Sequence, residues 1–215
     1  MKKLSLIAIV MVLLTSCTKV TLDNKYVEES AEKDLAALVK NKTITGEEKT
    51  LITDYISDKE IVTDDELTYS SILASAKDNK ARKERNELLQ KELDQKLSVV
   101  FIKKYYYTNG DGKYISFDVK VTNNTDVNIN GYRFGVSIKD GAGNELDSES
   151  WHDGQTVVKA KSSHVSEHFL VEYDNSDDKL VKLMAADLDK LQIEYHVISI
   201  IFADGTSLSL EEEEN

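Results

Sequence analysis

Histidines are the side chains here that could bind a transition metal, and all four lie in one half of the sequence: His152, His164, His168 and His196. His164 and His168 are four residues apart. On one strand they would share a face but lie about 13 Å apart along the backbone, which is too far to chelate one ion easily. No cysteine is available beside them. We therefore predict no metal site and no metal cofactor.

Oxygen-bearing side chains crowd a single segment, which holds Asp140, Asn144, Asp147, Glu149 and Asp153. Calcium prefers such ligands, but its twelve-residue loop needs alternating ligands, a central glycine and a final glutamate. The spacing here does not match that loop. A solvated acidic loop therefore explains the segment better than a calcium site.

Sequence motifs of common enzymes are absent. The chain contains no Gly-x-Ser-x-Gly, Ser-x-x-Lys or His-Glu-x-x-His, and no phosphate-binding or dinucleotide-binding glycine loop. Asp/Glu pairs carry no information in a chain with 39 acidic residues. We therefore predict no catalytic residues and no cofactor.

The only tryptophan, Trp151, stands beside His152 in a polar passage. An exposed Trp151 would be a natural anchor for a partner protein, because buried aromatic anchors dominate protein interfaces. The alternative is an indole packed beneath a β-sandwich. Trp151 and His152 are the candidate binding residues.

The start of the chain reads as a secretion signal. Met1-Lys2-Lys3 is positively charged, and the eleven residues 4–14 that follow carry no charge. They are too short to span a bilayer as a helix, which takes about 20 apolar residues. A basic segment followed by a short apolar one is typical of a secretory signal.

Leu14-Thr15-Ser16-Cys17 follows that apolar segment and resembles the lipobox of bacterial lipoproteins. The resemblance implies cleavage before Cys17 and attachment of a diacylglycerol to its thiol. Several acyl chains anchor firmly, because each buried CH₂ contributes about 0.8 kcal/mol. It also implies a place in the bacterial cell envelope, on the outer membrane if the host is Gram-negative. Cys17 is the only cysteine, which excludes an internal disulfide.

The net charge of the chain limits the classes of partner that it can bind. The formal net charge is −12, and removing the signal with its two lysines makes it more negative. This argues against nucleic-acid binding, which needs a basic face, and against a polybasic membrane patch. The membrane is therefore expected as a partner only through the N-terminal lipid.

Residues 24–98 show helical spacing of apolar residues, and we expect two to three helices there, the first over 24–40. Thr45-Gly46-Glu47-Glu48 is a capping box that marks a second helix start, and residues 63–66 repeat it. Residues 77–87 contain one apolar residue, Ala81. They are either a solvated part of a long third helix, the preferred reading, or a loop.

Residues 99–210 are rich in Val, Ile, Tyr, Phe and Thr, as strands require. In residues 114–122, alternation places Ile115, Phe117, Val119 and Val121 on one face. We expect a polar passage through Trp151, a short helix over 177–187, and strands over 99–108, 114–122, 127–139, 163–173, 191–202 and 207–210.

The stretch FDVKVTNNTDVNINGYRFGVSIKDGAGNEL, residues 117–146, resembles the FxLYD type of bacterial immunoglobulin-like domain. It has a strand, an Asn-rich turn, an apolar strand and an Asp-Gly turn, and the later IIFADGTSL is similar to the closing hairpin. The resemblance covers residues 99–210 and implies a non-catalytic envelope module. The helix at 177–187 and the passage through Trp151 depart from the pattern and leave the strand order open.

The predicted fold is therefore α+β, a helical region followed by an antiparallel immunoglobulin-like β-sandwich with one short inserted helix. The domains are a signal peptide (1–16), a tether (17–23), a helical region (24–98), the sandwich (99–210) and an acidic tail (211–215).

The predicted function is that of a lipid-anchored, non-enzymatic envelope protein that binds an unknown envelope protein. Binding would use the sheet edges, by strand addition, or the acidic loop 140–154. A hydrolase directed at the cell wall and a passive structural spacer are the alternatives.

Overall fold

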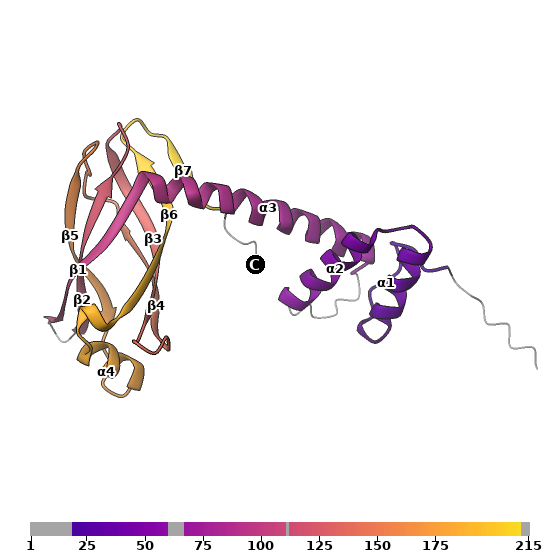
Figure 1. Cartoon of the computed structure of the whole chain (residues 1–215), viewed down its shortest axis with the longest axis horizontal. Helices are drawn as coiled ribbons and strands as arrows, with labels where there is room; N and C mark the ends of the chain where they lie inside the picture. Colours follow the sequence, from indigo (N-terminus) through magenta and orange to yellow (C-terminus); the bar gives the residue numbers. More distant parts are fainter. Residues whose placement is uncertain (1–18, 60–66, 111, 212–215) are drawn as a thin grey trace, which may run out of the picture. The chain divides into compact units, whose positions relative to one another are not determined.

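The computed structural model describes residues 19–59, 67–110 and 112–211 (Figure 1). The predicted signal peptide, Cys17, the second capping box and the end of the acidic tail lie outside the described residues. The chain divides into two compact units, one up to Ala81 and one from Arg82. Each unit has a hydrophobic core of its own.

Helices build the N-terminal unit: a 3₁₀ turn (Glu28–Ser30), α1 (Ala31–Lys40), α2 (Gly46–Lys59) and the first turns of α3 (Tyr69–Lys96). The buried residues of its core are Tyr26, Leu35, Leu38, Ile44, Ile52, Tyr69, Ile72 and Leu73. At the start of α2 the Thr45 amide donates to the Glu48 carboxylate at 2.9 Å, and the Glu48 amide donates to the Thr45 hydroxyl at 3.1 Å. The helix start predicted from the first capping box is confirmed.

The first α-helix begins at Ala31, which corrects the expected start at residue 24. Residues 24–27, which precede the 3₁₀ turn, pair instead with the chain that enters α3. The Tyr26 amide donates to the Leu67 carbonyl at 2.8 Å, and the Tyr69 amide donates to the Asn24 carbonyl at 3.2 Å. The rings of Tyr26 and Tyr69 then meet edge to face at 5.9 Å, so tertiary packing overrides the local helical spacing.

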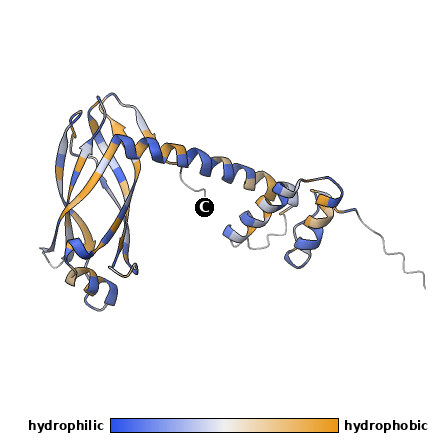
Figure 2. Cartoon of the chain, in the orientation of Figure 1, coloured by the Kyte–Doolittle hydropathy of each residue, from blue (hydrophilic) through white to orange (hydrophobic). Residues whose placement is uncertain are grey.

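α3 is one continuous helix that includes residues 77–87, so this stretch is helical and not a loop. Its polar character is visible in Figure 2, where most of the helix is hydrophilic. Lys, Arg and Glu are strong helix formers, which lets a solvated stretch stay helical. Among the described residues, no helix is both long enough and apolar enough to cross a membrane.

The unit from Arg82 contains two antiparallel sheets within its described residues. The first has the order β1-β2-β5, with β1 Leu97–Asn109, β2 Gly112–Asn123 and β5 Ser163–Glu172. The second has the order β4-β3-β6-β7, with β3 Ile129–Lys139, β4 Glu145–Asp153, β6 Gln192–Phe202 and β7 Ser207–Ser209. The predicted α+β class and antiparallel sheets are confirmed.

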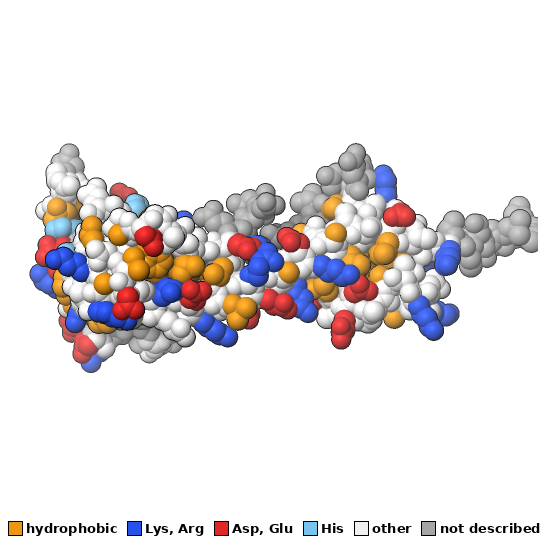
Figure 3. Space-filling view, turned by 90° about the horizontal axis from the view of Figure 1, so that it is seen from above, with side chains coloured by type: hydrophobic (Ala, Val, Ile, Leu, Met, Phe, Trp, Pro, Cys, Tyr) orange, Lys and Arg blue, Asp and Glu red, His pale blue; other side chains and the backbone are white. Residues whose placement is uncertain are grey.

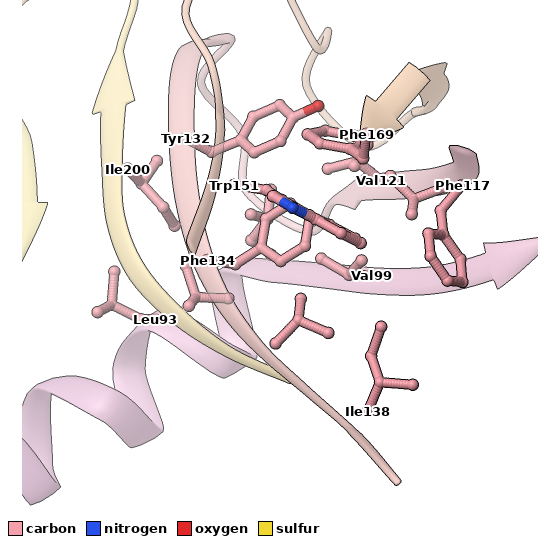
Figure 4. Close-up of a cluster of buried hydrophobic side chains, with 14 of the residues drawn as sticks. Leu93, Val99, Phe117, Val121, Tyr132, Phe134, Ile138, Trp151, Phe169 and Ile200 are labelled. Atoms are coloured by element: carbon pink, nitrogen blue, oxygen red, sulfur yellow. The ribbon is translucent and has the colours of Figure 1, made fainter. Parts of the chain in front are cut away.

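Side chains from the two sheets meet in a single core (Figure 4). The alternation predicted for β2 is confirmed, because Ile115, Phe117, Val119 and Val121 are all fully buried. From the other sheet, Phe134 and Val197 reach the same core. The domain is therefore a β-sandwich.

The passage through Trp151 is strand β4, not the irregular connection that the sequence led us to expect. Trp151 pairs with Phe134 of β3, and Asp147 and Glu149 pair with Ile138 and Val136. Those three β3 residues are buried, so Asp147 and Glu149 share one side of the edge strand with Trp151, where Asp147 is half-buried and Glu149 is exposed. Inward charges on an edge strand discourage pairing with other chains.

The predicted inserted helix is α4 (Asp178–Ala185), whose first turn is capped by the Asp177 carboxylate. A lysine from β1 binds the backbone carbonyls at the C-terminus of α4. The Lys104 ammonium donates to the carbonyls of Leu183 at 2.5 Å, Met184 at 3.0 Å and Ala186. Burial lowers the pKa of this lysine.

The C-terminal half of α3 packs on the sandwich through the buried Leu93 and through three polar side chains spaced four residues apart: Asn86, Gln90 and Asp94. Gln90 donates to the Val197 carbonyl at 3.2 Å, and the Val197 amide donates to Asp94 at 3.5 Å. Asn86 exchanges two hydrogen bonds with the backbone of Glu211, at 2.9 and 2.8 Å. Glu211, predicted to begin the tail, is therefore held on α3.

Candidate binding site

The two candidate binding residues from the sequence lie in different surroundings. The indole of Trp151 is 6% exposed and stacks on Phe169 at 5.3 Å, so it packs inside the sandwich and offers no contact surface (Figure 4). His152 follows it on β4 and is exposed. His152 lines a pocket of about 270 Å³ together with residues of β5.

The pocket lies between the edge strands of the two sheets, β4 and β5. The side chains that give it its chemistry are His152, Asp153, Gln155, Ser166, Glu167 and His168. Of these, the sequence singled out only His152 as a binding residue.

His168 lies at a bulge in β5. Ser166 pairs with Val119 of β2 and Phe169 pairs with Phe117, so Glu167 and His168 together stand opposite Asp118. The extra residue breaks the alternation of the strand. The expectation that His164 and His168 share a face is therefore wrong.

The backbone of His168 has φ +64°, in the left-handed region. Among the described residues, two other non-glycine residues have positive φ, Lys42 and Lys161, and both lie in turns. A non-glycine residue in this conformation costs about 1–2 kcal/mol. Such strain is typical of functional sites, because only the surrounding structure can maintain it.

A chain of hydrogen bonds holds the His168 ring on the outer face of the first sheet. Its Nδ1 atom lies 3.1 Å from the Tyr105 hydroxyl, which donates to Oδ1 of Asp118 at 3.0 Å. Asp118 is only 6% exposed. Desolvation and the bond to Asp118 raise the pKa of the Tyr105 phenol, which keeps its proton at neutral pH.

Aromatic and cationic groups surround this chain of bonds. The Tyr107 ring lies 4.6 Å from the His168 ring, centroid to centroid. The Lys103 ammonium lies 4.4 Å from the centroid of Tyr105 and 4.0 Å from Oδ2 of Asp118. The face already holds one ammonium group against an aromatic ring.

A second polar cluster fixes the pocket wall and links the two sheets. The hydroxyls of Tyr132 and Ser166 lie 2.6 Å apart, so one donates to the other, and Oδ2 of Asp153 lies 3.3 Å from the Tyr132 hydroxyl and 3.2 Å from the Ser166 hydroxyl. Oδ1 of Asp153 accepts from the amides of Gln155 and Thr156. Desolvation works to raise the Asp153 pKa, but these hydrogen bonds prevail and lower it.

This cluster is not an activated serine. The partners of the Ser166 hydroxyl are a phenol and a carboxylate, and a serine nucleophile needs a base such as an imidazole. The carboxyl with the raised pKa, Asp147 at about 6, owes the shift first to burial and then to Glu149. Asp147 does not line the pocket.

Within the described ranges, no three His, Cys, Asp or Glu side chains are arranged to hold a metal ion. Asp140, from the acidic segment, closes its own turn. It accepts from the amides of Ala142 and Asn144 and from the Asn144 side chain, each at 2.9 Å. The Asn144 bonds lower the pKa of Asp140.

Comparisons with known proteins leave the family open. No family model and no curated protein matches the sequence. A structural-genomics target solved by X-ray crystallography aligns at 9% identity over 54% of this chain and 80% of its own, with TM-score 0.27. A protein from Archaeoglobus fulgidus aligns at 16% identity over 54% of this chain and 100% of its own, with TM-score 0.30. These scores are too low to support an inference.

Proposed function

We propose that this protein is a lipid-anchored, non-enzymatic binding protein of the bacterial cell envelope, which holds a partner protein at the pocket between β4 and β5. The observation that carries the proposal is the left-handed His168, kept in a strained conformation at the pocket by Tyr105 and Asp118. A glycine would fill the same backbone position without strain. The imidazole therefore has a role beyond folding.

An immunoglobulin-like sandwich of the FxLYD type is part of this proposal. In a constant-type immunoglobulin domain, one sheet contains the first, second, fourth and fifth strands. The second sheet contains the third, sixth and seventh strands. The order here differs in one strand, because β4 pairs with β3. This near agreement supports the proposal.

Side chains in the pocket, not strand addition, are the proposed means of binding. β4 carries the half-buried Asp147 and β5 carries the bulge at His168. Both features discourage pairing of an edge strand with another chain. On the face of the molecule shown in Figure 3, acidic and basic side chains are interspersed. Such a mixture is typical of a solvated surface.

Crosslinking in living cells tests the binding role. A photoreactive amino acid at Gln155, in the pocket, is expected to capture one discrete partner protein. The same group at exposed Asp126, in the turn after β2, is the control and should not capture it. Capture of nothing, or of the same proteins at both positions, contradicts the proposal and favours the spacer. Release of cell-wall fragments by the purified protein would favour the hydrolase.

The anchor is tested separately by palmitate labelling. The lipobox predicts that the wild-type chain incorporates labelled palmitate and that Cys17→Ala does not. Label that persists in Cys17→Ala would contradict lipid attachment at this residue.

A further inference from the structure

The single proton of the Tyr105 phenol fixes the tautomer of His168. A phenol has one proton to donate, and Tyr105 donates it to Asp118 at 3.0 Å. Toward His168 the same oxygen can then only accept, so a hydrogen bond at 3.1 Å needs the proton on Nδ1, an atom that also lies 3.5 Å from the Ser116 hydroxyl. The neutral ring then carries its lone pair on Nε2.

The pocket that His168 lines also contains two carboxylates. Glu167 contributes a carboxylate next to His168, whereas both oxygens of the second carboxylate, Asp153, already accept hydrogen bonds from the protein. A ligand that brought only acceptors would leave Nε2 and the Glu167 carboxylate without donors. A hydrogen-bond donor with positive charge would satisfy both.

The size of the pocket and the net charge of the chain further limit the class of ligand that can bind. A volume of about 270 Å³ is below the range of roughly 300–1,000 Å³ for drug-sized ligands, so the end of a side chain suits it better. The chain carries a net charge of −12, which attracts basic partners. Lys103 over Tyr105 shows that an ammonium group is accommodated on the neighbouring surface.

We infer that the pocket between β4 and β5 binds a cationic side chain, the ammonium of a lysine or the guanidinium of an arginine, presented by the partner protein. The cation donates to Nε2 of His168 and to the carboxylate of Glu167. This inference rests on the proposed function and names the chemistry of its partner.

The test is a titration of the full chain in detergent micelles, with ¹⁵N-labelled histidines observed by NMR. N-acetyl-arginine amide is the probe, and N-acetyl-glutamine amide is the neutral control. We expect the Nδ1–H tautomer at His168 before any addition and a saturable shift of Nε2 with the arginine probe only. Glu167→Gln should weaken binding about tenfold, the loss of one charge-assisted hydrogen bond. His164→Gln, on the same strand outside the pocket, should not.

An Nε2–H tautomer, equal shifts with both probes, or unchanged binding in Glu167→Gln would each overturn the inference. Failure of the inference can be told from failure of the proposed function. If crosslinking at Gln155 captures a partner that Glu167→Gln still binds, the function stands and the cationic ligand is excluded. If no partner is captured, the function fails whatever the titration shows.

Discussion

The Nδ1 atom of His168 lies 3.1 Å from the Tyr105 hydroxyl, although β2 separates the strands that carry them. The contact forms because the bulge in β5 turns an exposed imidazole onto the outer face of the sheet. Tyr105 also donates to Asp118, so one phenol connects a buried carboxylate with a ring at the pocket. The role of each of these residues can be tested by substitution.

His168→Gly should leave the free energy of unfolding unchanged to within about 1 kcal/mol, because relief of the left-handed strain offsets the lost ring contacts. His168→Val should be less stable than His168→Gly by about 1–2 kcal/mol, since a β-branched residue tolerates positive φ poorly. Urea unfolding measures both. His164→Val is the control and should behave like wild type. Equal stability of the valine and glycine variants at 168 would contradict the strain.

Tyr105→Phe should lower the free energy of unfolding by about 1–3 kcal/mol, because it leaves the buried Asp118 carboxylate without its phenol donor. It should also free the His168 ring to populate both tautomers, which histidine NMR detects. Tyr106→Phe alters the neighbouring, 43% exposed tyrosine and serves as the control. A Tyr105→Phe protein with wild-type stability and a single tautomer would exclude the proposed chain of hydrogen bonds.

Asp147 should make stability depend on pH. Burial and Glu149 raise its pKa to about 6 in the folded chain, against 3.8 ordinarily. Between these values the folded state binds more protons than the unfolded one, so stability falls as pH rises from about 4 to about 6. Above pH 6, Asp147→Asn should be more stable than wild type by about 1–2 kcal/mol. Asp126→Asn, at an exposed position, is the control, and identical pH profiles for all three proteins would refute the shift.

Asn86→Ala should loosen the backbone of Glu211 on α3, while Arg85 still binds the Glu211 carboxylate at 2.8 Å. It removes both hydrogen bonds to the Glu211 backbone, which together contribute about 1–2 kcal/mol. Amide hydrogen exchange at Glu211 should accelerate while exchange in β2 stays unchanged. Glu87→Ala, the next position on the helix, is the matched control. Faster exchange in the control as well would mean that general helix destabilisation is responsible.

Local signals in the sequence predicted the regular elements well. Alternation in β2 and the Thr45–Glu48 capping box depend on neighbouring residues alone, and both appear as predicted. The start of α1 and strand β4 were missed because each depends on a distant partner. The segment at Asn24 pairs with the chain entering α3, and β4 pairs with β3.

The site was harder to predict than the fold. Residue type favours both Trp151 and His152 as binding residues, but β4 buries the first and exposes the second. The sequence distinguishes His168 only by its spacing from His164, and a shared face follows from that spacing only if the strand is regular. The bulge can be identified only from the register of β5 with β2. No residue type near His168 predicts it from the sequence.

The most direct measurement of the binding claim is recovery of the crosslinked partner at Gln155 in cells that carry wild type or His168→Gly. The two proteins are expected to fold equally well and to reach the membrane in equal amounts. The proposed site predicts that His168→Gly captures the partner at least about tenfold less, since it removes the ring and a charge-assisted hydrogen bond. Equal capture by both proteins would show that the strained histidine is not part of the binding site.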